Sequence, residues 1–82
     1  MFTVRWKRTA LDRLTELWLD AEDRNAINEA VSQIDEALSR NPSGAGESRT
    51  DTIRVMFEAP LGVFFEVNHD SQDVYVLRVW VF

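Results

Sequence analysis

The chain has 82 residues, 45% of them hydrophobic and including three Trp and five Phe, which predicts a single domain with its own core and argues against disorder. It contains no cysteine, so disulfides, thiolate zinc sites and cysteine nucleophiles are excluded. The net charge of −5 makes it a poor non-specific binder of nucleic acid, because neutralising phosphates drives that affinity.

The first predicted elements are a strand and a helix. Residues 2–6 alternate between apolar and polar side chains, which predicts a half-buried strand with Trp6 facing the core. Apolar residues then recur at helical spacing and predict a helix over 10–19. Thr9 is the expected N-cap, and Asp12 completes an imperfect capping box with it.

The second predicted helix has the clearest periodicity in the chain. Its apolar residues form one continuous stripe: Ile27, Ala30, Val31, Ile34, Ala37 and Leu38. The helix should end at Asn41, because a residue that precedes proline resists the helical conformation. A loop of roughly three to five residues joins the two helices, which predicts an antiparallel hairpin. Residues 43–51 read as a flexible connector rich in small side chains.

Three strands follow, at roughly 53–58, 63–68 and 74–81, and they predict an antiparallel meander. Pro60-Leu61-Gly62 suits a three-residue hairpin turn with glycine in the left-handed position. This turn would pair Ala59 with Val63.

That register assigns the side chains of the meander to two faces, provided that the last strand contains no bulge. The residues expected on the core face are Ile53, Val55, Phe57, Phe65, Val67, Tyr75, Leu77, Val79 and Val81. Those expected on the opposite face are Arg54, Met56, Glu58, Phe64, Glu66, Val74, Val76, Arg78 and Trp80. A slip of one residue would exchange the faces.

The face opposite the core mixes charges with uncovered aromatic side chains, a mixture typical of a binding surface. We predict that its binding residues are Arg54, Met56, Phe64, Glu66, Arg78 and Trp80. Within this set, Arg54, Glu66 and Arg78 should form one line across the strands. That line is either a site for an anion or an ordinary cross-strand ion network, and the sequence leaves both readings open.

Other candidate sites are weak. His69 is the single histidine and lies in a predicted loop without a placed nucleophile. The acidic residues lack metal-ligand spacing, and Gly44-Ala45-Gly46 lacks the lysine and the following helix of a phosphate loop. We therefore expect neither a metal nor a cofactor. No apolar run reaches the roughly 18 residues of a membrane span, and residues 1–7 lack a signal-peptide core, so a soluble, cytoplasmic protein without membrane contacts is expected.

The order and spacing of several segments resemble the RelE/ParE superfamily of toxins from bacterial type II toxin–antitoxin modules. The segments that carry the resemblance are Val4-Arg-Trp6, Ala10-Leu-Asp-Arg-Leu14, Asn41-Pro42, Gly46-Glu-Ser-Arg49, Ile53-Arg-Val-Met-Phe57, Leu61-Gly-Val-Phe-Phe-Glu-Val67 and Val74-Tyr-Val-Leu-Arg-Val-Trp80. The resemblance spans nearly the whole chain and implies one toxin domain over 1–82. The implied fold is α+β in the order β-α-α-β-β-β, with a helical hairpin on one face of the sheet.

The resemblance also implies a role in growth inhibition or plasmid stabilisation and neutralisation by a cognate antitoxin. Some members of the superfamily cleave mRNA on the ribosome, and others poison DNA gyrase. Arg49 and Arg54 match basic positions of the nucleases. The catalytic residues stay unknown at this stage, and Arg49, Arg54 and Arg78 are the weak candidates for them. However, Leu61-Gly-Val-Phe64 stands where the nucleases place an arginine, and the sequence stops at Phe82, where their last catalytic residues would follow.

Three readings therefore stay open at the level of sequence. The first is a toxin that acts by binding or as a feeble nuclease and is neutralised by an antitoxin. The second is a non-catalytic interaction module or decayed toxin with the same fold, and the third is a metal-independent, ribosome-dependent mRNA endoribonuclease. The target, the antitoxin and a homodimeric state are equally open.

Overall fold

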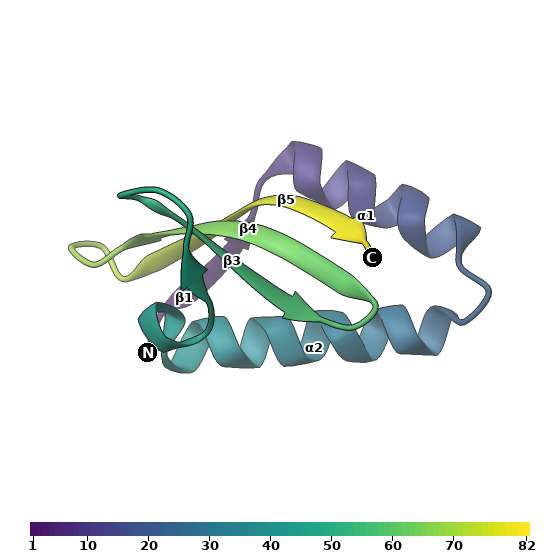
Figure 1. Ribbon diagram of the computed structural model, residues 1–82, viewed down its shortest axis with the longest axis horizontal. Helices are drawn as coiled ribbons and strands as arrows, with labels where there is room; N and C mark the ends of the chain where they lie inside the picture. The colour runs from purple at the N-terminus through teal and green to yellow at the C-terminus, as the bar shows by residue number, and fades with distance from the viewer.

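A computed structural model of the chain describes residues 1–82 and has an α+β architecture (Figure 1). In chain order the elements are β1 (Thr3–Trp6), α1 (Arg8–Asp20), α2 (Arg24–Arg40), the short 3-10 helix η1 (Pro42–Gly44), β2 (Glu47–Ser48), β3 (Ile53–Glu58), β4 (Leu61–Asn68) and β5 (Asp73–Val81). The five strands form one sheet in the order β1-β5-β4-β3-β2. The predicted strand, helical hairpin and antiparallel meander are confirmed, and the structure adds β2 within the expected connector.

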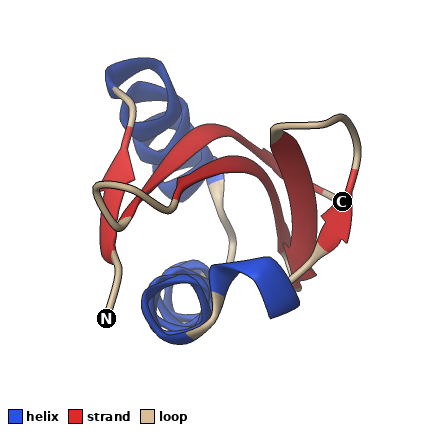
Figure 2. Cartoon of the chain, turned by 90° about the vertical axis from the view of Figure 1, so that its left-hand side faces the viewer, coloured by secondary structure: helices blue, strands red, loops and turns tan.

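The sheet is antiparallel except at one edge, where β1 pairs with β5 in parallel. Parallel strands need a long connection between them. In this chain α1 and α2 provide it, because both helices follow β1 and precede the other strands in the sequence. Figure 2 shows the sheet curving around α2, while α1 flanks the edge of the sheet near β5. No helix is both long and apolar enough to cross a membrane.

Helix α1 begins two residues earlier than expected, and Thr9 is not its N-cap. The N-cap is Lys7, whose side chain makes no capping hydrogen bond. The backbone N–H of Lys7 donates to the carbonyl oxygen of Val76 at 2.9 Å, which continues the β1–β5 pairing up to this residue. A tertiary hydrogen bond therefore sets the start of the helix, and local capping chemistry does not.

The helical hairpin is held by its own loop. Asp23 caps α2 by accepting a hydrogen bond from the backbone N–H of Ala26 at 3.1 Å. Arg24 donates to the carbonyl oxygens of Trp18 and Leu19 at the end of α1, both at 3.1 Å. Its guanidinium also lies 4.4 Å from the centroid of the Trp18 ring. These contacts satisfy carbonyl groups that the end of a helix leaves unpaired.

The core lies between α2 and one face of the sheet. The apolar stripe predicted for α2 is confirmed: four of its residues are buried (Ile27, Ala30, Ile34 and Leu38) and the other two are half-buried. They pack against a sheet face whose apolar residues are Met56, Leu61, Val63, Phe65, Val74, Val76 and Val79. The indole of Trp6 packs at the margin of this core and donates to Asp35 at 2.9 Å.

The predicted register between β3 and β4 is wrong. The turn comprises Ala59 and Pro60, so Glu58 pairs with Leu61, where Ala59 was expected to pair with Val63. This is a shift by an odd number of residues, and strand side chains alternate with a period of two, so it exchanges the faces of β3 relative to β4. The shift buries Leu61 completely, which the predicted turn would have left in a loop.

The corrected register turns three polar or long side chains of β3 towards the α2 side: Arg54, Met56 and Glu58. Ile53, Val55 and Phe57 face the other way, contrary to the prediction. We call this other side the open face. Its residues on the three meander strands are Ile53, Val55, Phe57, Gly62, Phe64, Glu66, Tyr75, Arg78 and Trp80.

A bulge in β5 corrects the second half of the face assignment. Phe64 pairs with Arg78 but Phe65 pairs with Val76, so Leu77 has no partner on β4. Val74 and Val76 are completely buried on the α2 side, although they were expected on the opposite face. Beyond the bulge the prediction is confirmed for Val79, which is buried, and for the placement of Arg78 and Trp80.

A salt bridge joins the parallel strands β1 and β5, and its contribution to stability should depend on pH. The Nε of Arg5 donates to Asp73 Oδ1 at 3.1 Å. Hydrogen bonds from Ser71 and then from Arg5 lower the pKa of Asp73 below its ordinary value, which is about 4. A lowered carboxyl pKa stabilises the fold above the unfolded-state pKa, and that stabilisation is lost as the pH falls through the folded-state pKa.

We therefore expect Asp73→Asn to lower the free energy of unfolding at pH 7, with a difference from the wild type that shrinks below about pH 4. Urea denaturation at a series of pH values measures this. Asp70→Asn is the matched control, because Asp70 lies in the loop just before β5 and makes no ion pair. A difference that is the same at pH 7 and at about pH 2 would contradict the electrostatic explanation.

Candidate functional site

The structure brings together four of the six predicted binding residues. Phe64, Glu66, Arg78 and Trp80 share the open face, on the neighbouring strands β4 and β5. The other two, Arg54 and Met56, lie on the α2 side of the sheet, and their predicted placement is wrong. The odd register shift between β3 and β4 is the physical reason.

Arg54 is held by contacts within the fold and does not lie on the open face. It is half-buried, and its guanidinium donates to the carbonyl oxygen of Gly46 in the segment that leads into β2. Its Nε is buried without a hydrogen-bond partner. The predicted line of Arg54, Glu66 and Arg78 therefore does not form, and none of the three takes part in a salt bridge. Both readings of that line, the anion site and the ion network, depended on a register that the chain does not adopt.

Four aromatic side chains form the most prominent feature of the open face, and we call them the aromatic cluster: Phe57, Phe64, Trp80 and Phe82. The Phe64 and Trp80 ring centroids are 4.8 Å apart, and Phe57 meets Trp80 at 6.0 Å and Phe82 at 5.2 Å in edge-to-face contacts. Phe57 and Phe82 remain 57% and 62% exposed. Large aromatic surface that stays in water is a mark of an interaction site.

Phe57 belongs to this cluster although its side chain was predicted to face the core. The alternation of apolar Phe57 with Arg54 and Met56 along β3 correctly predicts that Phe57 lies on the opposite face from these two residues. Alternation alone does not show which of the two faces is buried.

A glycine makes room for the aromatic cluster. Gly62 pairs with Trp80 across β4 and β5, and a Cβ atom at this position would lie only 2.6 Å from the indole ring. The indole thus lies directly against the bare backbone of β4, a contact that a side chain at position 62 would prevent. Trp80 is fixed from beneath by Gly62 and from the side by Phe64.

Three arginines lie near the Phe64 side of this cluster. Arg78 lies opposite Phe64, is exposed, and makes no ion pair. The guanidinium carbon of Arg49 lies 5.9 Å from the Phe64 ring centroid, so Phe64 has an arginine on two sides. Arg13 of α1 borders the same region, and together with Phe64, Arg78 and Trp80 it lines a cleft of about 480 Å³. Arginine and tryptophan are the side chains that contribute most often to interface energetics.

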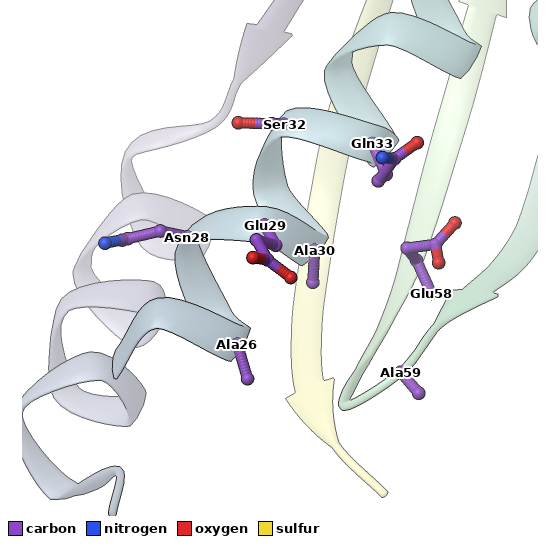
Figure 3. Close-up of a pocket in the computed structure, with 8 residues that line it drawn as sticks. All are labelled: Ala26, Asn28, Glu29, Ala30, Ser32, Gln33, Glu58 and Ala59. Carbon is purple, nitrogen blue, oxygen red and sulfur yellow. The ribbon is translucent and has the colours of Figure 1, made fainter. Parts of the chain in front are cut away.

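A second hollow, of about 430 Å³, lies between α2 and the β3–β4 turn (Figure 3). Glu29 and Gln33 of α2 and Glu58 of β3 are its polar lining. Asn28 and Ser32 belong to the same lining but extend from the side of α2 that faces away from Glu58. The polar groups do not converge on one point, so this hollow offers no chemistry.

His69 lies away from the aromatic cluster, beyond the end of β4. Its ring meets Phe2 edge-on at 5.8 Å, and its Nε2 is 3.4 Å from the hydroxyl of Ser43. The His69 ring makes no hydrogen bond to a carboxylate that would orient it. Nowhere in the chain do three His, Asp or Glu side chains gather in a way that could hold a metal ion. The open face is therefore the candidate functional site.

Comparison with solved structures identifies the fold. The chain is similar to the RelBE2 toxin–antitoxin complex from Mycobacterium tuberculosis (TM-score 0.81, 21% identity, covering 99% of this chain and 91% of that one). It is also similar to the isolated RelE toxin from E. coli, with a TM-score of 0.75 and 13% identity over 99% of this chain and 84% of that one. The chromosomal ParDE system from P. aeruginosa is similar too, with a TM-score of 0.69 and 21% identity over 99% of this chain and 96% of that one. No protein-family model and no curated sequence matches the chain. The chain has the RelE/ParE-type toxin fold, and the resemblance in segment order is confirmed at that level.

The contact between Gly62 and Trp80 gives a prediction for the site. Gly62→Ala should displace the indole and lower the free energy of unfolding by about 1–3 kcal/mol, the usual cost of overpacking. In a Trp80→Ala background the same glycine substitution should cost much less, because the clashing ring is gone. Chemical denaturation of the four proteins of this double-mutant cycle measures the coupling. Additive effects would show that Gly62 serves another purpose.

Proposed function

We propose that this chain is the toxin of a type II toxin–antitoxin module and that a cognate antitoxin neutralises it by covering the open face. The observation that carries the proposal is the aromatic cluster with free arginines beside it. Phe57 and Phe82 are more than half exposed, and Arg78 has no intramolecular partner. A binding partner would remove this apolar surface from water, and each buried Å² of it contributes roughly 25 cal/mol.

The structural neighbours support an antitoxin as that partner. Two of the similar structures are described as a toxin–antitoxin complex and a toxin–antitoxin system, and a third is described as the RelE–RelB complex of an archaeon. Fold by itself does not carry function, so the proposal rests on the surface of this chain. Growth inhibition and plasmid stabilisation are the biological roles that we attach to it.

We further propose that the toxin acts by binding its target. Phosphate-backbone cleavage needs several groups that converge on one phosphate, to stabilise charge and to move protons. Of the three catalytic candidates, Arg49 and Arg78 flank Phe64, while Arg54 lies on the other side of the sheet and is bonded to Gly46. His69, a natural general base, contacts Phe2 and Ser43. These placements favour binding over efficient cleavage.

A non-catalytic interaction module or decayed toxin would use the same surface but would not arrest growth. Expression of the chain without its neighbouring reading frames discriminates between the two: growth arrest supports a toxin, and normal growth supports an interaction module. The choice between the ribosome and DNA gyrase as the target then follows from whether translation or DNA supercoiling is inhibited.

We expect the purified protein to be a weak or inactive nuclease. The measurement is addition to translating ribosomes followed by primer extension on the mRNA. Efficient cleavage at the ribosomal A site that is lost in Arg54→Ala or Arg78→Ala would contradict this expectation, because it would show that these arginines act together despite their separation on the two faces of the sheet.

We expect Arg78→Ala and Trp80→Ala to weaken binding of the co-encoded antitoxin by about 2 kcal/mol each, as for residues at the centre of an interface. Each should cost the fold only about 1 kcal/mol, since neither residue belongs to the core under α2. Calorimetric titration and thermal melts measure the two effects. Arg40→Ala is the control, an exposed arginine on α2 that pairs only with Glu36. Normal binding by both variants would mean that the open face is not the site.

A further inference from the structure

The cleft beside the aromatic cluster has an apolar interior. It lies between the first turns of α1 and the second half of β5. Its lining includes Ala10 and Val79, which are only 1% and 4% exposed, and the aromatic residues Phe64 and Trp80. Its volume of about 480 Å³ exceeds that of a single leucine or phenylalanine side chain.

The charge at the rim of the cleft is opposite to the charge of the whole protein. The chain carries −5, but the lining of the cleft holds Arg13 and Arg78 and no carboxylate. Arg78 has no ion pair, and Arg13 pairs only with Glu16, one turn along its own helix, at 3.1 Å. Both side chains of that pair are more than half exposed, so water screens the attraction and a partner can replace the pair at little cost.

The aromatic side chains fit a peptide better than the bases of a nucleic acid. One face of the Trp80 indole lies on Gly62, Phe57 meets the ring edge-on, and Phe64 is tilted by 56° against it. Base stacking on a protein needs an aromatic ring whose flat face is free, and these rings are inclined to one another. A pocket walled by inclined rings is suited to a branched or aromatic side chain.

We propose that this cleft receives one leucine- or phenylalanine-sized side chain of a partner segment whose flanking carboxylates pair with Arg13 and Arg78. The inference rests on the proposed function, because it describes the segment of the antitoxin that would occupy this part of the open face. The apolar side chain would supply affinity by leaving water. The two carboxylates would fix its orientation, since a guanidinium binds a carboxylate through two parallel hydrogen bonds.

Four synthetic probes test the cleft without knowledge of the antitoxin. The first is a blocked pentapeptide with a central leucine between two pairs of glutamates. The second has serine for the leucine, the third has lysines for the glutamates, and the fourth is a hexauridylate. NMR titration follows the methyl groups of Ala10 and Val79 and the indole N–H of Trp80.

We expect shifts at these three residues with the first peptide alone, at millimolar affinity, and weaker binding in high salt. Arg13→Gln and Arg78→Gln should each weaken binding roughly two- to five-fold, the range of an exposed ion pair. The control Arg40→Gln should have no effect. Equal binding of the serine peptide, shifts only with hexauridylate, or no shifts up to about 10 mM would each overturn the proposal.

The antitoxin separates this proposal from the proposed function. One outcome is that Trp80→Ala weakens antitoxin binding while Arg13→Gln and Arg78→Gln leave it unchanged. The open face is then the interface but the cleft does not bind carboxylates, so this inference fails and the proposed function stands. If the antitoxin does not bind the open face at all, yet the acidic leucine peptide binds the cleft, the proposed function fails and the chemistry of the cleft stands.

Discussion

The pairing of β3 with β4 is the constraint on which the rest of this structure depends. A turn of two residues, Ala59 and Pro60, places Leu61, Val63 and Phe65 on the face that packs on α2. Because side chains alternate along a strand, the same pairing sends Gly62 and Phe64 to the opposite face. The core and the open face are therefore set by one register, and neither could change without the other.

The bulge at Leu77 lets β5 serve both faces. Val74 and Val76 lie completely buried in the first half of the strand, and strict alternation from them would drive Arg78 and Trp80 into the core. The extra residue reverses the alternation, so that Val79 returns to the core and Trp80 reaches the backbone of Gly62. Bulges commonly redirect a side chain next to a functional site, and this one builds the wall of the cleft.

The contacts that hold the fold lie in a different part of the molecule from the proposed binding surface. The fold is held by the apolar layer between α2 and the sheet, by Arg24 at the hairpin and by the salt bridge of Arg5 with Asp73 at the parallel edge. The aromatic cluster and Arg78 lie outside that layer. This separation leaves the open face with side chains whose contacts the fold does not complete, which is the physical basis for assigning a partner to it.

The order of the elements, the apolar stripe of α2 and the end of that helix at Asn41 were predictable from the sequence, because each depends on residues that are close together in the chain. The sequence also identified Phe64, Glu66, Arg78 and Trp80 as companions on one face. Three features could not be predicted in this way. Arg54 and Met56 lie on the α2 side of the sheet, Phe57 is exposed, and α1 begins at Arg8. These features depend on a strand register, a bulge and a hydrogen bond to Val76, all of which join residues that are distant in the chain. In addition, alternation with a period of two is compatible with either face of a strand being the buried one.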